Sequence, residues 1–440
     1  MIKKTLHRAS KLLTGLFKKT SVFRKKLYFG KAPYGIDEDA LILFPYLPGR
    51  LSCGLTAMLA FRRAGDSLSS PQNTKNAESI ETIIKTIRAQ GLPEPGNDAS
   101  PVDSSCLGGP EAAEKLFYEI KALKQQDNFH GLVCDKQESE RLEKTLETLA
   151  GLTGDETRKF NRWTGLLSAR VFDQISARIE NLKDASWCLK TEVIGNIEKV
   201  RDLLGNQANP AKSAVYAARQ INSVFNSIDR LEVRGRDSAG ISIIFVLSRD
   251  SFGHFEKTLQ SRNLEEEFGY RAQQSLLTNR NISVRHSQDN TGREISTVAL
   301  TYKVAAEIGR LGDNIAFLRS QVRNDEIFHC LVNIEHEHFT VSAHTRWASV
   351  GEISEANCHP VDAATVSAPA GETAIIHASL NGDIDNYQNL KAAHRAAGIR
   401  YPEEITCDTK IIPVHVASYL NRGHDIEEAF RLAVNDFEGS

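Results

Sequence analysis

Apolar residues recur at steps of three and four over most of the chain between residues 111 and 205. Such spacing puts apolar side chains on one face of a helix and leaves charged side chains on the other. Four stretches show it, punctuated by Gly151, Gly154 and Gly205: Ala112–Lys124, Lys136–Leu149, Asp155–Leu182 and Lys190–Leu204. Four helices with short connections predict an antiparallel helical bundle over 111–205. It holds no Gly-rich phosphate loop and no ligand-spaced His or Cys set, so it is interpreted as an inserted scaffold or interface module.

A different pattern, short apolar runs bounded by turn residues, predicts strands on both sides of this bundle. Cys53–Phe61 has the composition of a buried strand, and the polar, proline-containing stretch 64–110 that follows is interpreted as loop or linker. Beyond the bundle, Ser213–Leu231 predicts an amphipathic helix that leads through an Arg-Gly turn into a strand over Gly240–Leu247.

The rest of the chain alternates between the two patterns. A hairpin turn is predicted at Asp289-Asn290-Thr291-Gly292, between two β-rich stretches. A helix over Val304–Arg323 precedes a histidine-rich strand region at 328–344, and Ile426–Val434 has a helical pattern.

Composition limits the class of protein. The 440 residues are 41% hydrophobic and 25% charged, which is typical of a globular protein of two or three domains. A formal net charge of −2 gives no reason to expect nucleic acid as a partner. The seven cysteines form no CxxC pair and are odd in number, which favours free thiols in a reducing, cytoplasmic compartment.

The amino-terminal segment is strongly basic. Residues 1–31 contain ten Lys or Arg and no acid, and their apolar residues fall near helical spacing. Three interpretations stay open: a removed leader or propeptide within 1–52, contact of 1–31 with an anionic membrane, or a helix that packs on its own domain. The first is favoured over membrane contact.

Five short motifs follow one another along the chain. They are Cys53-Gly54, Arg234-Gly235-Arg236-Asp237-Ser238, His344-Thr345-Arg346-Trp347-Ala348-Ser349, Leu380-Asn381-Gly382-Asp383-Ile384 and Cys407-Asp408-Thr409. In this order they resemble the glutamine-hydrolysing half of the glucosamine-6-phosphate synthases (glutamine–fructose-6-phosphate aminotransferases), amidotransferases whose nucleophile is an N-terminal cysteine. The resemblance covers Cys53–Phe61 and roughly residues 211–440.

The resemblance implies an α+β fold, a four-layer sandwich of the N-terminal-nucleophile hydrolases with two antiparallel sheets between helix layers. The amidotransferase domain would comprise 53–63 and 211–440, with the linker 64–110 and the inserted helical bundle 111–205 between its two parts. In the family the chain continues beyond the equivalent of Ser440 into another core strand, so this domain is expected to be incomplete at its C-terminus.

The resemblance also implies the chemistry. Cys53 is the candidate nucleophile with its own α-amine as base, which requires a cut between Ser52 and Cys53. The Asn381 amide and the Gly382 backbone N–H would form the oxyanion hole, in which two donors face the developing negative charge. An inert strand cysteine at 53 and a plain Asn-Gly turn at 381–382 are the alternatives.

Other motif residues are assigned to the grip on glutamine. Arg346 would hold the α-carboxylate and Asp408 the α-ammonium group. The residues that would line the pocket or support the turn beside the cysteine are Trp347, Ser349, His359, Arg234 and Asp237. Three positions depart from the family pattern: Val350 and Leu380, where histidine is usual, and Lys410, where an acid is usual.

No cofactor is implied, and no metal is predicted. Four histidines lie within sixteen residues, and His336 and His338 would share one face of a strand. The spacing of a further ligand is absent, and a polar strand face explains the pattern equally well. The histidines concerned are His329, His336, His338 and His344.

The expected function is hydrolysis of L-glutamine to glutamate and ammonia. By resemblance, the ammonia would pass to fructose 6-phosphate on a sugar-isomerase domain outside this chain, and a homodimer is one expected assembly. Two alternatives are kept: an amidophosphoribosyltransferase-like enzyme, and a non-catalytic scaffold or binding protein with a vestigial glutaminase pocket.

Overall fold

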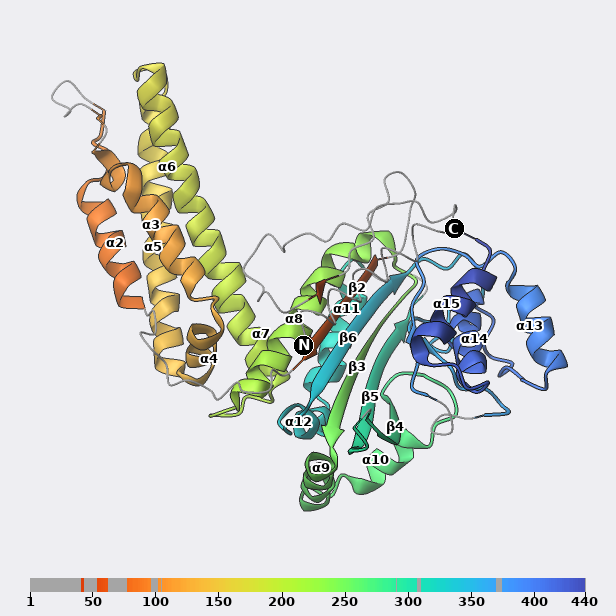
Figure 1. Cartoon of the computed structure of the whole chain (residues 1–440). Helices are drawn as coiled ribbons and strands as arrows, with labels where there is room; N and C mark the ends of the chain where they lie inside the picture. Colours follow the sequence, from red (N-terminus) through yellow and green to blue (C-terminus); the bar gives the residue numbers. More distant parts are fainter. Residues whose placement is uncertain are drawn as a thin grey trace. The chain divides into compact units, whose positions relative to one another are not determined.

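The computed structural model describes residues 41–42, 54–61, 77–95, 102–103, 105–289, 291–306, 310–368 and 374–439. The chain divides into two units (Figure 1). The sheet unit comprises Met1–Arg63 and Ser223–Ser440, and the helical unit comprises Ala64–Asn222. The division falls within one long helix, α8 (Lys212–Leu231). No helix in the described parts of the chain is both long and apolar enough to cross a bilayer.

The sheet unit is organised around a six-stranded antiparallel sheet with the order β1-β2-β6-β3-β5-β4. Its strands are β1 (Leu41–Ile42), β2 (Gly54–Phe61), β3 (Ser238–Ser248), β4 (Asn281–Gln288), β5 (Glu294–Ala305) and β6 (His338–Arg346). The central strand β3 is an almost continuous apolar run and is buried along nearly its whole length. Burial of both faces requires cover on both sides of the sheet.

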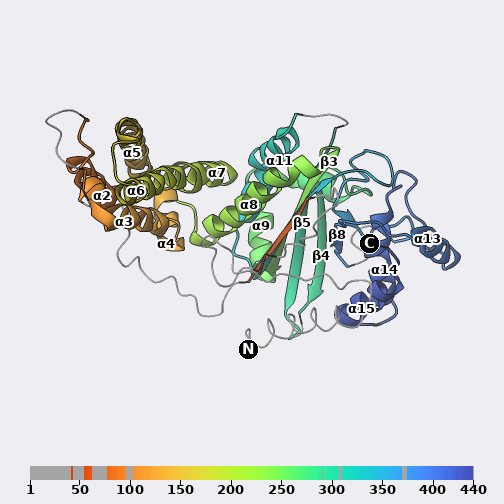
Figure 2. The ribbon, with the colours of Figure 1, turned by 90° about the horizontal axis from the view of Figure 1, so that it is seen from above.

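Two layers supply that cover. Figure 2 shows α11 (Asp313–Arg323) on one side of the sheet and the C-terminal elements on the other. With α9 (Arg249–Ser261), α11 packs on β3 and β5. The opposite layer contains a two-stranded antiparallel pair, β7 (Val361–Asp362) with β8 (His377–Ala378), and the helices α13 (Tyr387–Ala396), α14 (Ile411–Leu420) and α15 (Ile426–Asp436). The α+β class is therefore present, whereas the second sheet amounts to one short pair among the described residues and the four-layer sandwich stays a prediction.

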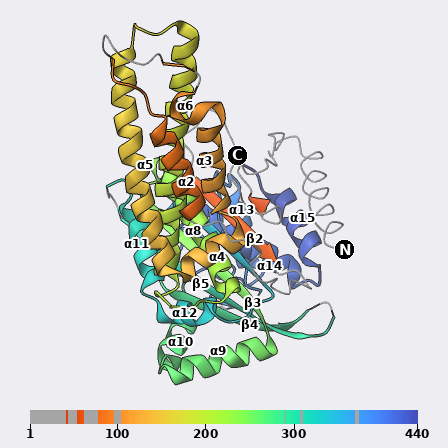
Figure 3. The same ribbon diagram turned by 90° about the vertical axis from the view of Figure 1, so that its left-hand side faces the viewer.

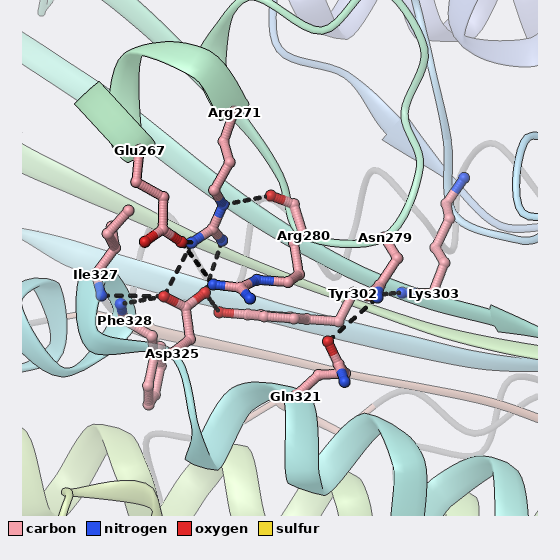
Figure 4. A network of polar contacts seen from close by, with 10 residues as sticks. All are labelled: Glu267, Arg271, Asn279, Arg280, Tyr302, Lys303, Gln321, Asp325, Ile327 and Phe328. Atoms are coloured by element: carbon pink, nitrogen blue, oxygen red, sulfur yellow. Dashed lines mark hydrogen bonds and ion pairs between the residues drawn. The ribbon is translucent and has the colours of Figure 1, made fainter. Parts of the chain in front are cut away.

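A buried ion pair joins the sheet to two helices (Figure 4). Arg271 of α10 (Glu265–Ala272) donates to both carboxylate oxygens of Asp325, at 2.9 and 2.6 Å, and the Tyr302 hydroxyl of β5 donates to the same carboxylate at 2.7 Å. Asp325 also accepts the Ile327 N–H at 3.0 Å and so caps α12 (Glu326–Val332). Burial opposes its charge, but the hydrogen bonds and the attraction of Arg271 outweigh burial and lower the pKa of Asp325.

The helical unit is a bundle in which α3 and α5 both pack on α6 (Figure 3). Its helices are α2 (Ala77–Ala89), α3 (Gly109–Ala122), α4 (Gln126–Cys134), α5 (Lys136–Trp163), α6 (Ala169–Trp187) and α7 (Gly195–Leu203), with a π-helical turn, Cys188–Ile194, before α7. The helix expected over Asp155–Leu182 is two helices, because the chain turns at Gly165, whose φ of 84° is left-handed and favours glycine.

Three expected segments differ from the structure. The stretch 64–110, interpreted as loop or linker, contains α2, whose isoleucines at 80, 83, 84 and 87 face the bundle core. The helix expected over Val304–Arg323 begins only at Asp313, because β5 continues to Ala305 in full register with β3. The strand region expected at 328–344 starts with α12, since the Asp325 cap favours a helix there.

Candidate functional site

The candidate site lies at the edge of the sheet where β2 and β3 begin and β6 ends. The register places Gly54 of β2 and Ala239 of β3 on either side of Thr345 of β6. Antiparallel pairing brings the start of one strand beside the end of its neighbour, so motifs far apart in sequence meet here. Cys53 itself lies outside the described residues and is joined to this edge by its peptide bond to Gly54.

Asp237 ties the turn before β3 to the loop after β6. Its carboxylate accepts the Ala348 N–H at 2.7 Å, and its own N–H donates to the Arg346 carbonyl at 3.2 Å. Arg234 ends the short helix Glu232–Arg234, and its side chain lies outside the described part of the chain. These contacts put Asp237 in a supporting position, while its role toward the cysteine stays a prediction.

Arg346 is a buried cation held by backbone oxygens. Its guanidinium donates to the Glu352 carbonyl at 3.3 Å and also to the Val350 carbonyl. No carboxylate pairs with it among the described residues, so the geometry leaves its charge available to an anion. Trp347, the next residue, is 50% exposed and therefore contributes surface rather than core.

The loop around Asn381 and Gly382 is hydrogen-bonded to the loop of Ser349 and to Asp408. Ser349 Oγ donates to the Asp383 carboxylate at 2.6 Å. The Ile384 N–H donates to Asp408 Oδ2 at 2.8 Å, and the other oxygen of Asp408 accepts the N–H of the next residue. The structure thus gathers the segments of Ser349, Asn381–Gly382 and Asp408 in one place.

Asp408 is buried, and this changes its acidity. Burial raises the pKa of Asp408, and the nearby Asp383 carboxylate acts in the same direction. The hydrogen bonds from Ile384 and Thr409 act in the opposite direction without cancelling the shift. A cationic group bound here would favour the ionised form.

His359 lies against a second histidine, His344 of β6. The ring centroids are 4.5 Å apart, both residues are at least nine-tenths buried, and neither ring makes a hydrogen bond of ordinary geometry with the described residues. Burial lowers the pKa of His344 to about 3 and that of His359 well below its ordinary value, and Arg346 contributes to both shifts. Both imidazoles are therefore neutral, with polar ring nitrogens left for another partner.

Glycine lets the His359 loop reach the sheet. A Cβ atom at Gly240 of β3 would lie 2.2 Å from the His359 carbonyl oxygen, closer than atoms can approach. Two residues along the same strand face, Ser242 bonds to His377 of β8 at 2.6 Å. The layer that carries His359 is therefore packed directly on β3.

A polar cluster lies close to His359 and Cys407. Lys410 donates to Asp362 at 2.5 Å, and both side chains are largely buried. The fully buried Lys303 donates to the Glu355 carbonyl at 3.1 Å, and the Asn279 backbone N–H donates to the Glu355 carboxylate at 3.0 Å (Figure 4 shows Asn279 and Lys303). Burial lowers the pKa of Lys303 to about 8, while Asp362 acts to raise it.

Several of these residues were not predicted from the sequence. Lys410 was noted as a departure, but its partner Asp362 was not, since 48 residues separate them. His344 was considered as a metal ligand only. The one local signal was Lys303, a lysine that lies between Tyr302 and Val304 in the strand β5. Among the described residues, no group of three or more His, Cys, Asp or Glu side chains is arranged to hold a metal ion.

Comparison with known proteins gives a partial similarity. No family model matches the chain. It is 33% identical over 106 residues to a glutamine–fructose-6-phosphate aminotransferase (isomerizing) of Sulfurisphaera tokodaii, which is 24% of this chain and 16% of the relative. Aminotransferases of the same name from Sulfolobus acidocaldarius and Haemophilus ducreyi are 37% and 36% identical over 98 residues, 22% of this chain and 15% and 14% of theirs. The chain thus shares with these enzymes a segment of about one hundred residues, roughly one seventh of their length.

Proposed function

We propose that the sheet unit is a glutamine amidotransferase domain that hydrolyses L-glutamine to glutamate and ammonia. The observation that carries this proposal is the convergence of Arg346, the Asn381–Gly382 turn and Asp408 beside the start of β2. A buried cation without a carboxylate partner among the described residues and a buried carboxylate suit the two charged ends of an α-amino acid. The partial similarity to glutamine–fructose-6-phosphate aminotransferases supports the same reaction class.

In the proposed mechanism Cys53 attacks the side-chain amide carbon. The free α-amine of Cys53 takes the thiol proton and delivers it to the departing ammonia. The tetrahedral oxyanion receives hydrogen bonds from the Asn381 amide and the Gly382 N–H. Water then hydrolyses the thioester, which releases glutamate and restores the thiol. Arg346 would hold the α-carboxylate and Asp408 the α-ammonium throughout.

We further propose that the ammonia serves synthesis of glucosamine 6-phosphate from fructose 6-phosphate on a sugar-isomerase domain outside this chain. Support for this finer assignment comes from the names of the similar proteins alone. Its test is production of glucosamine 6-phosphate in a reaction where this chain supplies ammonia from glutamine to an isomerase domain.

The deciding experiment is labelling with a glutamine analogue that carries a diazoketone in place of the amide. Mass spectrometry should place the label on Cys53 alone, in a mature chain that begins at Cys53. Active protein that retains residues 1–52 would rule out the α-amine as base. Label spread over several cysteines would favour a non-catalytic protein.

Two variants test the assigned roles separately. Asn381→Ala should lower kcat by about 10²- to 10³-fold with little change in KM, since it removes one oxyanion donor. Arg346→Ala should instead raise the glutamine KM by about 10- to 150-fold, which corresponds to the binding free energy lost with one charge-assisted hydrogen bond. The opposite division between kcat and KM would show that the two roles are misassigned.

A further inference from the structure

Asp383 occupies a position between the two ends of the candidate site. It directly follows the Asn381–Gly382 turn, and one of its carboxylate oxygens accepts the Ser349 hydroxyl at 2.6 Å. Ser349 belongs to the loop that follows Arg346. This hydrogen bond therefore joins the loop of the candidate oxyanion hole to the loop of the candidate carboxylate grip.

The backbone on either side of Asp383 is fixed. Ile384 forms a β-bridge with Gly439, and the Asp385 N–H donates to the Glu438 carbonyl at 2.7 Å. The approach is close, since a Cβ at Gly439 would lie 2.0 Å from the Asp383 carbonyl oxygen. A carboxylate on such a clamped segment keeps its position without a ligand, which is what a recognition site requires.

Asp383 and Asp408 are two acidic residues on segments that are hydrogen-bonded to each other. The Asp383 charge is close enough to raise the pKa of Asp408, and Ile384, adjacent to Asp383, donates its N–H to Asp408 at 2.8 Å. Among the described residues neither acid forms an ion pair with Lys or Arg. Two like charges that are partly removed from water repel each other, and a bound cation would relieve that repulsion.

A second, independent feature points to a ligand at this place. His344 and His359 are at least nine-tenths buried, and none of their ring nitrogens makes a hydrogen bond of ordinary geometry with the described residues. They lie beside Arg346, and the backbone of Leu380, just before the Asn381–Gly382 turn, interacts with His344. Unsatisfied buried donors and acceptors are rare, so a bound polar molecule is expected next to this turn.

We propose that Asp383 is a specificity-determining residue that shares with Asp408 the binding of the substrate's α-ammonium group. An ammonium group has three N–H donors and is best held by several acceptors. Asp408 already accepts two backbone N–H groups, whereas Asp383 uses one oxygen for Ser349. The inferred substrate class is a free α-amino acid amide, with discrimination against glutamine whose amino group is acylated or in a peptide bond. This inference rests on the proposed glutaminase function.

The test compares Asp383→Asn with wild type on L-glutamine and on N-acetyl-L-glutamine. Asparagine keeps an acceptor for Ser349 and removes only the charge. The glutamine KM should rise about 10- to 100-fold with kcat within about 3-fold, because a charge-assisted bond to the ammonium is lost. Activity on the acetylated substrate should not fall, so the preference for free glutamine should shrink by the same factor. Asp385→Asn is the matched control, since Asp385 is exposed on the same loop and should change neither value.

Calorimetry gives a readout without turnover. In a Cys53→Ala background, Asp383→Asn should weaken L-glutamine binding by the same 10- to 100-fold. Unchanged affinity and unchanged substrate preference in a wild-type protein that does hydrolyse glutamine would overturn the role of Asp383 alone. A wild-type protein that neither binds nor hydrolyses glutamine would overturn the proposed function itself, and the role of Asp383 with it.

Discussion

In the buried cluster of Asp362, Lys410 and Lys303, we expect loss of the carboxylate to destabilise the fold much more than loss of one ammonium group. Asp362 bonds to Lys410 at 2.5 Å, and the two side chains are 11% and 2% exposed. Lys303 is a second buried cation in the same neighbourhood, since Asp362 raises its pKa and Lys410 lowers it. One carboxylate therefore stabilises two ammonium groups.

The magnitudes follow from which charge is removed. Loss of one partner of a buried pair costs about 3–5 kcal/mol, mostly because the other charge is left unpaired. Asp362→Asn leaves two buried ammonium groups together, so we expect a loss of unfolding free energy near 5 kcal/mol. Lys410→Met keeps the volume and leaves Asp362 with Lys303 nearby, so its loss should be about 1–2 kcal/mol. Against a typical total stability of about 5–15 kcal/mol, the first change alone should be severe.

Urea unfolding followed by circular dichroism at pH 7.5 measures these losses in the two single variants and the double variant. The double variant should be more stable than Asp362→Asn alone, because it removes one of the two buried ammonium groups that have lost their carboxylate partner. The deficit of Asp362→Asn should also shrink as the pH rises toward 8 and then stay constant. Without Asp362 the pKa of Lys303 falls below its wild-type value of about 8, so the folded variant loses this charge at a lower pH than the wild type does. Equal losses in the two single variants, or strictly additive losses, would refute this account of the cluster.

Three further predictions concern the layers around the site. Burial lowers the pKa of His377 to about 4, so only the unfolded chain binds this proton as the pH falls from 6.5 to 4. The free energy of unfolding should therefore fall over that window. His377→Gln should make the free energy of unfolding, measured in urea, less dependent on pH there. Gly240→Ala forces a Cβ to within 2.2 Å of a facing carbonyl and should cost about 1–3 kcal/mol, whereas Gly253→Ala, in open space on α9, should be neutral or stabilising in the same melting assay. Tyr302→Phe removes the buried hydroxyl that donates to Asp325 and should cost about 1.5–3 kcal/mol in urea unfolding; no loss would mean that Arg271 alone satisfies the carboxylate.

Sequence patterns predicted those helices and strands whose bounds depend mainly on residues close by in the sequence. The strand after Cys53, the helix that ends at Leu231 and the strand after the Arg-Gly turn all lie within a few residues of their expected bounds. The helix expected from Val304 was wrong at its start, because pairing with β3 outweighs local helical spacing up to Ala305. α2 was missed because the prolines and polar residues around it suggested a linker.

The candidate site was likewise predicted only in part. Motif order alone suggested which segments would meet, and the meeting of the segments of Ser349, Asn381–Gly382 and Asp408 agrees with it. The partners that hold these segments could not be predicted, because Asp383 and Ser349 are 34 residues apart and each is unremarkable alone. The roles of Cys53 and Arg234 stay predictions, since Cys53 and the Arg234 side chain lie outside the described residues.

The place of the helical unit in the chain has a consequence for the order of folding. β2 precedes that unit and pairs with β6, roughly 290 residues further along, so the sheet edge at the candidate site cannot close until nearly the whole chain is available. Contacts within Ala64–Asn222 are between nearby helices and form on a much faster timescale. During synthesis the bundle is thus expected to fold before β6 is available to pair with β2. The folded bundle then shortens the effective length of the chain segment between β2 and β6. The end of the sheet that carries the candidate site would be the last part to form. Under the proposed function, the Cys53 thiol would therefore meet its substrate pocket only after the rest of the chain has folded.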